Sequence, residues 1–507
     1  MKLPKPTFLD CLAVLLIISL PISGCMPQSE PVALAMPGEF PPAESPVVDE
    51  PAAQAPQVTP FPTRPAYSPG ELVDYTVQSG DTLPALAVHF NTRVEEIREA
   101  NPFIPEQVTT LPPGMPMKIP IYYAPLWGSP FQVLPDSQFV NGPAQAGFDV
   151  RSYLEGTTGW FKDYVVFADE ANRDGAEAIA LISQNFSVSP RLLLALLEYH
   201  GDALSQPIQA HSDPDYLFGI RGPKYRGPYM QLVWAANTIN NAYYSWRTGD
   251  LTIIHHKDGT VERPDPWQNA ATVALQDYFS RLLSPDEYAV AVGPDGFFRT
   301  YTALFGDPWA ADQPHIPGSL VQPEFSLPFE PGTTWAYTGG PHTGWGTGAP
   351  LAALDFAPPS LVGGCVYTDE WATAVAPGVV VRSEPGTVVL DLDMDGDERT
   401  GWIAFYLHVG TAGRAPLGAV LEAGDPIGHP SCEGGKSTGT HIHIARKYNG
   451  EWMLAEGPLA FNLEGWVAYN GGAPYFGTMT RFGETITACL CSNGASFITS
   501  EKGMQAK

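Results

Sequence analysis

The chain has 507 residues, more than one hydrophobic core usually organises, and typical domain sizes predict about three domains. Its 54 acidic and 27 basic residues give a formal net charge of −27, which repels phosphate backbones and argues against nucleic acid as a partner. After residue 25 no apolar run approaches the length of a membrane span, about 20 residues, so no transmembrane helix is expected there.

The first 25 residues are expected to be a lipoprotein signal. Lys2 and Lys5 precede an apolar stretch at residues 11–20, and ISGC follows at residues 22–25, the pattern of a secretion signal that ends in a bacterial lipobox. In lipoproteins of this pattern the cysteine is diacylated and becomes the mature N-terminus. Cys25 would then be the only membrane anchor of an extracytoplasmic protein. A plain signal peptide cut nearby is the alternative.

Residues 26–70 are rich in Pro, Ala, Glu and Val without periodicity, a composition that predicts an extended linker. Residues 71–121 differ, because their apolar pattern and turn residues predict the order β-α-α-β. The expected elements are a strand at 75–77, a helix from about residue 83, a second helix from residue 92 to 101 and a strand at 117–119.

This second segment resembles the LysM module over its whole length, through YTVQSGDTL, the helix end IREAN and the terminal KIP. LysM modules bind N-acetylglucosamine glycans in the groove between the first strand–helix loop and the second helix–strand loop. By position, the resemblance implies a glycan-binding set of Gly80, Asp81, Thr82, Leu83, Asn101, Pro102 and Ile104. Asp81 and Thr82 can also be explained as caps of the first helix, and the two roles are compatible.

Residues 140–315 predict a mostly helical domain. Ser189-Pro190 forms a helix start, and the following segment RLLLALLEYH is apolar nearly all round, so this helix is expected at the centre of the domain. Further helices are expected at residues 229–247 and 267–283, with a small hairpin between them that turns at Asp258-Gly259.

The central helix ends with Glu198, and YLFGIRG follows at residues 216–222. This pattern weakly resembles lysozyme-like and glucosaminidase-like enzymes, in which a Glu at such a helix end is the general acid that cleaves glycan. An apolar helix end can raise the pKa of a carboxyl group for that role. However, Tyr199-His200 replaces the usual Ser after the Glu, so an ordinary helix-end residue or the vestige of a site is the alternative.

From residue 323 to 488, short β-branched runs separated by Gly and Pro predict an antiparallel β-sheet domain, and residues 489–507 form a tail without a clear pattern. One turn is strongly acidic, with carboxylates around Gly396 that match the front half of a calcium loop. Trp402 stands where that loop would need a bidentate Glu, so an acidic turn between two strands is the preferred interpretation. The candidate calcium ligands are Asp391, Asp393, Asp395 and Asp397.

Four histidines and one aspartate of this domain match the ligand inventory of a catalytic zinc site, which takes three protein ligands and leaves a fourth position to water. They are His342, Asp355, His408, His441 and His443. Strand alternation in THIHIARKY places His441 and His443 on one face, and in FYLHV it places His408 on the same face as Tyr406. A Gly-rich loop at residues 343–350 separates His342 from Asp355 and can fold both back to one centre.

Residues 325–467 resemble the lysostaphin-type peptidoglycan metalloendopeptidases, above all the β-lytic subgroup, in which a Gly-rich insert likewise separates the His from the Asp. The resemblance implies that His342, Asp355 and His443 bind one zinc ion. It also implies that His408 and His441 orient or deprotonate the attacking water and stabilise the oxyanion. Noncatalytic relatives typically lose ligands, and this chain has all five residues.

Cys365, Cys432, Cys489 and Cys491 follow the signal, and an oxidising compartment permits alternative pairings. Cys365 with Cys432 is favoured because both lie in loops of the β domain. Cys489 and Cys491 are two residues apart, a spacing that strains a direct bridge, and their role stays open.

The sequence therefore predicts a lipid-anchored hydrolase of multidomain α+β fold that cuts peptide cross-links of peptidoglycan and is targeted by its LysM module. Its expected partners are the glycan strands and peptide stems of peptidoglycan. Two alternatives remain: a noncatalytic murein-binding scaffold or amidase activator, and a glycan-cleaving enzyme that acts through Glu198.

Overall fold

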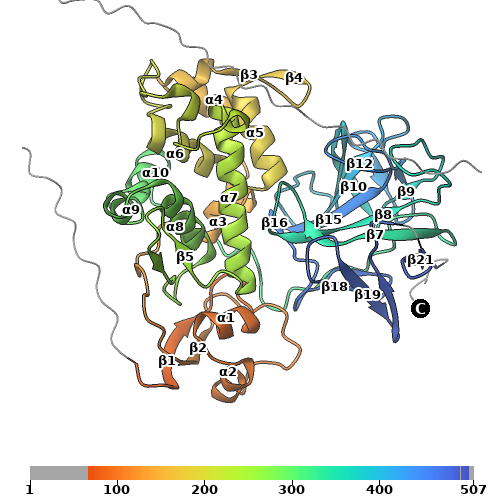
Figure 1. Ribbon diagram of the computed structural model, residues 1–507, viewed down its shortest axis with the longest axis horizontal. Helices are drawn as coiled ribbons and strands as arrows, with labels where there is room; N and C mark the ends of the chain where they lie inside the picture. The colour runs from red at the N-terminus through yellow and green to blue at the C-terminus, as the bar shows by residue number, and fades with distance from the viewer. Residues whose placement is uncertain (1–66, 492, 502–507) are drawn as a thin grey trace, which may run out of the picture. The chain divides into compact units, whose positions relative to one another are not determined.

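The protein is described by a computed structural model of residues 67–491 and 493–501 (Figure 1). The expected signal, the lipidated Cys25 and the linker up to residue 66 lie outside the described residues. Among the helices of the described part, none is long and apolar enough to cross a membrane. The expected fold class, a β-α-α-β module, a helical region and an antiparallel β domain, is confirmed.

The first module has the expected order of elements. They are β1 (Glu71–Thr76), α1 (Leu83–His89), α2 (Val94–Ala100) and β2 (Pro116–Ile121). The two strands pair antiparallel, with Tyr75 opposite Met117. The Thr82 hydroxyl accepts a hydrogen bond from the Ala85 amide at 3.4 Å, so this residue does cap α1.

The middle region is helical around one central helix. Its helices are α3 (Asp136–Phe139), α4 (Val150–Glu155), α5 (Gly175–Phe186), α6 (Pro190–Gly201), α7 (Pro228–Thr248), α8 (Ala270–Leu282), α9 (Pro285–Ala291) and α10 (Phe297–Phe305). Short 3-10 turns lie at Pro143–Gln145, Trp160–Asp163, Pro214–Tyr216 and Pro223–Tyr225. Two small hairpins complete the region, β3 (Val165–Ala168) with β4 (Ala171–Asp174) and β5 (Ile254–His255) with β6 (Val261–Glu262).

The central helix is α6, as expected from its apolar sequence. Every residue from Leu192 to Leu197 is fully buried, and the Ser189 hydroxyl caps the helix by accepting a hydrogen bond from the Leu192 amide.

The β domain is built on a nine-stranded antiparallel sheet (Figure 1). Eight strands follow the order β13-β10-β11-β12-β15-β8-β7-β21, and β16 pairs with β15. The bounds are β7 (Thr334–Thr343), β8 (Leu351–Ala357), β10 (Gly378–Glu384), β11 (Gly386–Asp391), β12 (Trp402–Val409), β13 (Val420–Leu421), β15 (Ile442–Tyr448), β16 (Glu451–Trp452) and β21 (Phe497–Thr499).

Smaller sheets flank the large one. β9 (Ala372–Thr373) pairs with β14 (Pro426–Gly428), and a four-stranded sheet holds β17 (Asn462–Leu463), β18 (Trp466–Asn470), β19 (Gly477–Arg481) and β20 (Glu484–Thr487). The tail, in which the sequence shows no pattern, supplies β21 and so covers the free edge of β7.

The two faces of the large sheet belong to different hydrophobic cores. Ile442, Ile444 and Tyr406 contribute to a core within the β domain. Phe405 and Ala445 face the opposite way and join the core of the helical region. Hydrogen bonds support this second contact, since the Trp452 amide donates to the Tyr244 hydroxyl and the Trp452 indole donates to the Phe186 carbonyl.

Both cysteine pairs of the β domain are bridged. The favoured Cys365–Cys432 disulfide is present and links loops 67 residues apart. Cys489 and Cys491 also form a disulfide, contrary to the expectation that their spacing disfavours one. Their Cα atoms are 4.8 Å apart, within the range that a disulfide can span, about 4.4–6.8 Å.

Candidate metal centre

Four adjacent strands bring the histidines and the aspartate of the β domain to one place. His342 lies near the end of β7, Asp355 lies on β8, and His443 lies on β15 directly opposite Asp355 in the sheet register. Leu407 of β12 is opposite His443 in turn, so His408 follows on the next strand. His342 and His443, 101 positions apart in sequence, thus become neighbours through strand pairing.

Three ligand atoms converge at this point. His342 Nε2 lies 3.0 Å from His443 Nδ1 and 3.2 Å from Asp355 Oδ1, and His443 Nδ1 lies 3.4 Å from the same oxygen. Ligands held at the usual zinc distances of about 2.0–2.2 Å in a tetrahedron would be about 3.3 Å apart. The three residues are 2%, 6% and 6% exposed, so the cluster is buried. The described residues therefore fit a zinc ion.

The far sides of the two imidazoles are fixed by backbone carbonyls. His342 Nδ1 lies 2.9 Å from the Gly340 oxygen, and His443 Nε2 lies 3.2 Å from the Gly344 oxygen. Each carbonyl can accept only a proton-bearing nitrogen, which leaves the facing nitrogen of each ring free to bind a metal. Asp355 Oδ1 is buried and accepts no hydrogen bond from any of the described residues. A buried carboxylate oxygen in this state favours a cation at the shared point.

The electrostatics of the cluster follow from burial and from the close charges. Burial by itself would raise the pKa of Asp355, but the attraction of His342 and His441 outweighs it and holds that pKa well below the usual range. Burial lowers the pKa of His443 and, assisted by repulsion from His441 and His443, lowers the pKa of His408 to about 4. Asp355 is therefore ionised and His408 is neutral near pH 7.

His441 and His408 lie beside the three ligand atoms. His441 Nε2 is 3.7 Å from Asp355 Oδ1, and the rings of His408 and His441 are 4.6 Å apart. A backbone carbonyl holds the Nδ1 atom of each ring. His441 Nδ1 lies 2.8 Å from the Gly439 oxygen, and His408 Nδ1 lies 2.8 Å from the Glu433 oxygen. Within the described residues neither Nε2 atom has a hydrogen-bond partner, so both are available for proton transfer.

The prediction that His408 shares its face with Tyr406 is wrong. The Tyr406 hydroxyl is in the opposite core, where it accepts a hydrogen bond from the Val375 amide. Strand β11 pairs Thr387 with Leu407 but Gly386 with Val409, so His408 is the extra residue of a β-bulge, with φ of 65°. A bulge interrupts the alternation of side chains and turns His408 toward His441.

Tyr475 contributes to the site, although the sequence analysis did not predict it. The ring of Tyr475 stacks on His342 with 4.2 Å between ring centroids, and its backbone bonds to Gly340 and Pro341 hold it in the left-handed region at φ of 72°. Tyr475 lies in the turn between β18 and β19, far from any of the histidine motifs. Only the pairing of distant segments could have indicated it.

The residues expected to bind glycan are divided between the module's interior and its loops. Leu83, Asn101 and Ile104 are buried, and the Asn101 side chain donates to the carbonyls of Ile97 and Lys118. Asp81 accepts hydrogen bonds from the Tyr75 hydroxyl at 2.7 Å and the Gln78 amide at 2.8 Å.

Gly80, Thr82 and Pro102 complete this set of seven. Thr82 caps α1, and Pro102 is exposed. Gly80 contacts the helical region, as described below.

Glu198 does not face the metal centre. Its carboxylate accepts hydrogen bonds from the amides of Leu204 at 2.8 Å and Ser205 at 3.2 Å, which fastens the loop that follows α6. In the structure Glu198 is therefore engaged in a local backbone contact.

The acidic turn is held together by its own hydrogen bonds. Asp391 accepts from the amides of Asp393 and Gly396, and Asp397 forms a 2.6 Å ion pair with Arg399. Asp391, Asp393 and Asp395 have carboxylate oxygens within 4.8 Å of one another, but these internal partners agree with the preferred interpretation as a turn.

Comparisons with known proteins find two matching families and several relatives. Residues 75–120 match the LysM domain family, and residues 132–318 match the family described as LasA, N-terminal domain. Protease LasA from Pseudomonas aeruginosa is 26% identical over 347 residues, which cover 64% of this chain and 75% of that protein. Beta-lytic metalloendopeptidase from Lysobacter enzymogenes is 27% identical over 168 residues, covering 33% of this chain and 88% of that protein.

Among solved structures, the M23 metalloprotease pseudoalterin is 24% identical and covers 33% of this chain and 96% of its own, with a TM-score of 0.28. The match of the helical region to the LasA N-terminal domain gives no support to a lysozyme-like interpretation of residues 140–315. The chain is a homologue of LasA and the beta-lytic metalloendopeptidases, and a LysM module and a helical region precede its metallopeptidase domain.

Proposed function

We propose that this protein is a cell-wall hydrolase, a zinc-dependent endopeptidase that cleaves peptide cross-links of peptidoglycan outside the cytoplasm. The observation that carries the proposal is the convergence of His342 Nε2, His443 Nδ1 and Asp355 Oδ1 within 3.0 to 3.4 Å of one another. The homology to beta-lytic metalloendopeptidase supports the same class of reaction.

His342, Asp355 and His443 would hold the zinc ion. When bound, zinc supplies Lewis acidity, which polarises the scissile carbonyl and makes water a nucleophile at neutral pH. Asp355 offsets part of the metal's charge, and the carbonyls of Gly340 and Gly344 keep the two imidazoles in the orientation that binding needs.

His441 and His408 would move the protons of the reaction. Both rings have Nδ1 fixed by a backbone carbonyl and Nε2 free, so one can accept the proton of the attacking water and one can donate a proton to the leaving amine. His441 lies next to Asp355 Oδ1 and His408 lies next to His441, positions that also suit them to stabilise the oxyanion that develops during attack.

The LysM module would bind the glycan strands and raise the local concentration of peptide substrate. A lipid on Cys25 would tether the enzyme to a membrane, and the linker would let it reach the wall. The rival role of a noncatalytic scaffold or amidase activator does not require all five site residues, and this chain retains all five.

Isolated peptidoglycan incubated with the soluble protein, lacking residues 1–25, tests the proposal through mass spectrometry of the released muropeptides. New free amino termini that disappear in His443→Ala would establish the endopeptidase and identify its bond. Glu198→Gln is the matched control, and it should leave the products unchanged. Cut glycan strands that depend on Glu198, with intact peptides, would instead make the helical region the catalyst.

A further inference from the structure

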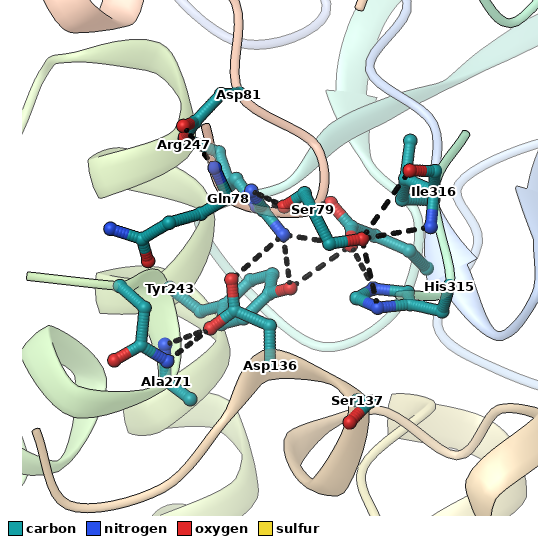
Figure 2. Close-up of polar contacts among 12 residues, drawn as sticks. Gln78, Ser79, Asp81, Asp136, Ser137, Tyr243, Arg247, Ala271, His315 and Ile316 are labelled. Carbon is teal, nitrogen blue, oxygen red and sulfur yellow. Dashed lines mark hydrogen bonds and ion pairs between the residues drawn. The ribbon is translucent and has the colours of Figure 1, made fainter. Parts of the chain in front are cut away.

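The first loop of the LysM groove is in contact with the rest of the chain (Figure 2). Arg247 of α7 donates a hydrogen bond to the Ser79 carbonyl, and its guanidinium packs on Gly80 so closely that a Cβ atom there would lie 2.6 Å from it. The Ser79 hydroxyl accepts from the Ile316 amide at 2.9 Å and lies 3.3 Å from His315 Nδ1.

Buried charges hold this contact in place. Arg247 pairs with Asp136 at 3.0 Å and with Glu451 of β16 at 3.2 Å, and His315 Nε2 lies 2.7 Å from Glu451 (Figure 2). The four side chains are at most 8% exposed. The network therefore joins the LysM loop to the helical region, to residue 315 and to the peptidase domain.

The second loop of the groove is contacted, at Thr109 and Thr110, by the segment that follows His315. The Thr109 hydroxyl donates to the Leu320 carbonyl at 2.6 Å, and the Thr110 hydroxyl donates to the Pro317 carbonyl at 2.7 Å. The Ser319 amide donates to the Thr110 carbonyl at 2.8 Å. We name residues 315–320, which contact both loops of the groove, the latch.

The space left between the two loops is too small for a sugar. The cavity lined by Gly80, Thr82, Thr109 and Thr110 has a volume of about 70 Å³, and its other walls are formed by Arg247, Ile316 and several residues between 451 and 459. Sites for small ligands usually have volumes of about 300 Å³ or more. A glycan chain can therefore enter the groove only after the segments that line this space, the latch among them, have moved.

We propose that the latch is an intramolecular competitor of glycan, which closes the LysM groove until a glycan strand displaces it. This inference rests on the proposed glycan binding by LysM. Displacement would take His315 away from Glu451, whose strand β16 pairs with the β15 strand that carries His443. Binding of glycan and release of this contact are then linked, each favouring the other.

Gly318 offers a way to weaken the latch without changing the LysM module or the metal centre. A Cβ atom on Gly318 would lie 2.6 to 2.8 Å from atoms of Pro112, so Gly318→Ala must push the latch away from the groove. Gly494→Ala is the matched control, because a Cβ atom there meets nothing within 4 Å.

The experiment is calorimetric titration of the protein lacking residues 1–25 with a hexamer of N-acetylglucosamine. We expect Gly318→Ala to bind the hexamer about fivefold or more tightly than the wild type and Gly494→Ala to bind as the wild type does. Ser79→Ala removes only the hydroxyl contacts to the latch, so this variant should also bind the hexamer more tightly than the wild type. If the Ser79 hydroxyl instead contacts glycan directly, Ser79→Ala would bind the hexamer less tightly.

Equal affinities of all variants would overturn the latch and leave glycan binding by LysM intact. If neither the wild type nor Gly318→Ala binds the hexamer, the glycan-binding proposal fails and the latch fails with it. Thermal unfolding of each variant shows whether it is folded at the temperature of the titration. If Gly318→Ala does not fold, Ser79→Ala provides the same test.

Discussion

The metal centre and the network around Arg247 are both buried clusters of ionisable side chains, but their atoms are arranged in opposite ways. In the network, Arg247 lies between two carboxylates, so a cation of the chain itself pairs with both. In the metal centre, two imidazole nitrogens and a carboxylate oxygen, all of them metal ligands when deprotonated, point at the same spot. The first arrangement is complete within the chain, whereas the second needs an ion from outside.

Removing a residue from the metal centre should have the largest effect on activity. His443→Ala removes one of the three metal ligands. Mutation of residues that only hydrogen-bond to a ligand typically lowers metal affinity or activity by about 10- to 100-fold, so we expect the activity of this variant to fall by at least about 100-fold. Zinc content should fall from one ion per chain toward none, with the fold retained, as measured by elemental analysis and circular dichroism. Full zinc content in this variant would contradict the assignment of His443.

Removing a proton-transfer residue should separate catalysis from metal binding. His441→Gln and His408→Gln should lower kcat by about 100- to 10,000-fold, the usual contribution of general acid–base catalysis, with zinc content unchanged. Steady-state kinetics on a peptide substrate, read together with zinc analysis, gives the answer. Loss of zinc in either variant would move that histidine into the ligand set.

The Arg247 network should instead affect stability. Arg247→Met leaves Asp136 and Glu451 buried without their cation, and we expect the free energy of unfolding in urea to fall by about 3–5 kcal/mol. Arg226→Met is the control, because the Arg226–Asp215 pair is largely exposed and should contribute about 1 kcal/mol or less. A similar small loss in both variants would mean that the network is not the structural junction described above.

The smallest expected effect is a pH dependence of the protein's stability that comes from Asp81. Burial raises the pKa of its carboxyl from 3.8 to about 6, so the folded protein binds this proton more tightly than the unfolded chain does. Its contribution to stability is therefore highest below pH 3.8 and is lost as the pH rises toward 6. Urea unfolding between pH 4 and 6 should show a decline in the wild type that is shallower in Asp81→Asn by up to about 2 kcal/mol. Parallel pH profiles would contradict the prediction.

Local patterns allowed much of the fold to be predicted from sequence. The capped helix α6 and the alternating strand that carries His443 have the structure expected, because their periodicity is encoded in neighbouring residues. The face of His408 was not predictable, because it depends on a bulge set by pairing with Gly386 on another strand. Three further features were not predicted, because their partners are distant in the sequence. They are the contact of Tyr475 with His342, strand β21 and the Arg247 network.

X-ray absorption at the zinc edge of the purified protein tests the central claim most directly. The account predicts one zinc ion per chain, bound by nitrogen and oxygen ligands at about 2.0–2.2 Å, with two imidazoles in the shell and loss of most of the zinc signal in His443→Ala. A protein that retains no zinc, or a spectrum with sulfur ligands that is unaffected by His443→Ala, would contradict it.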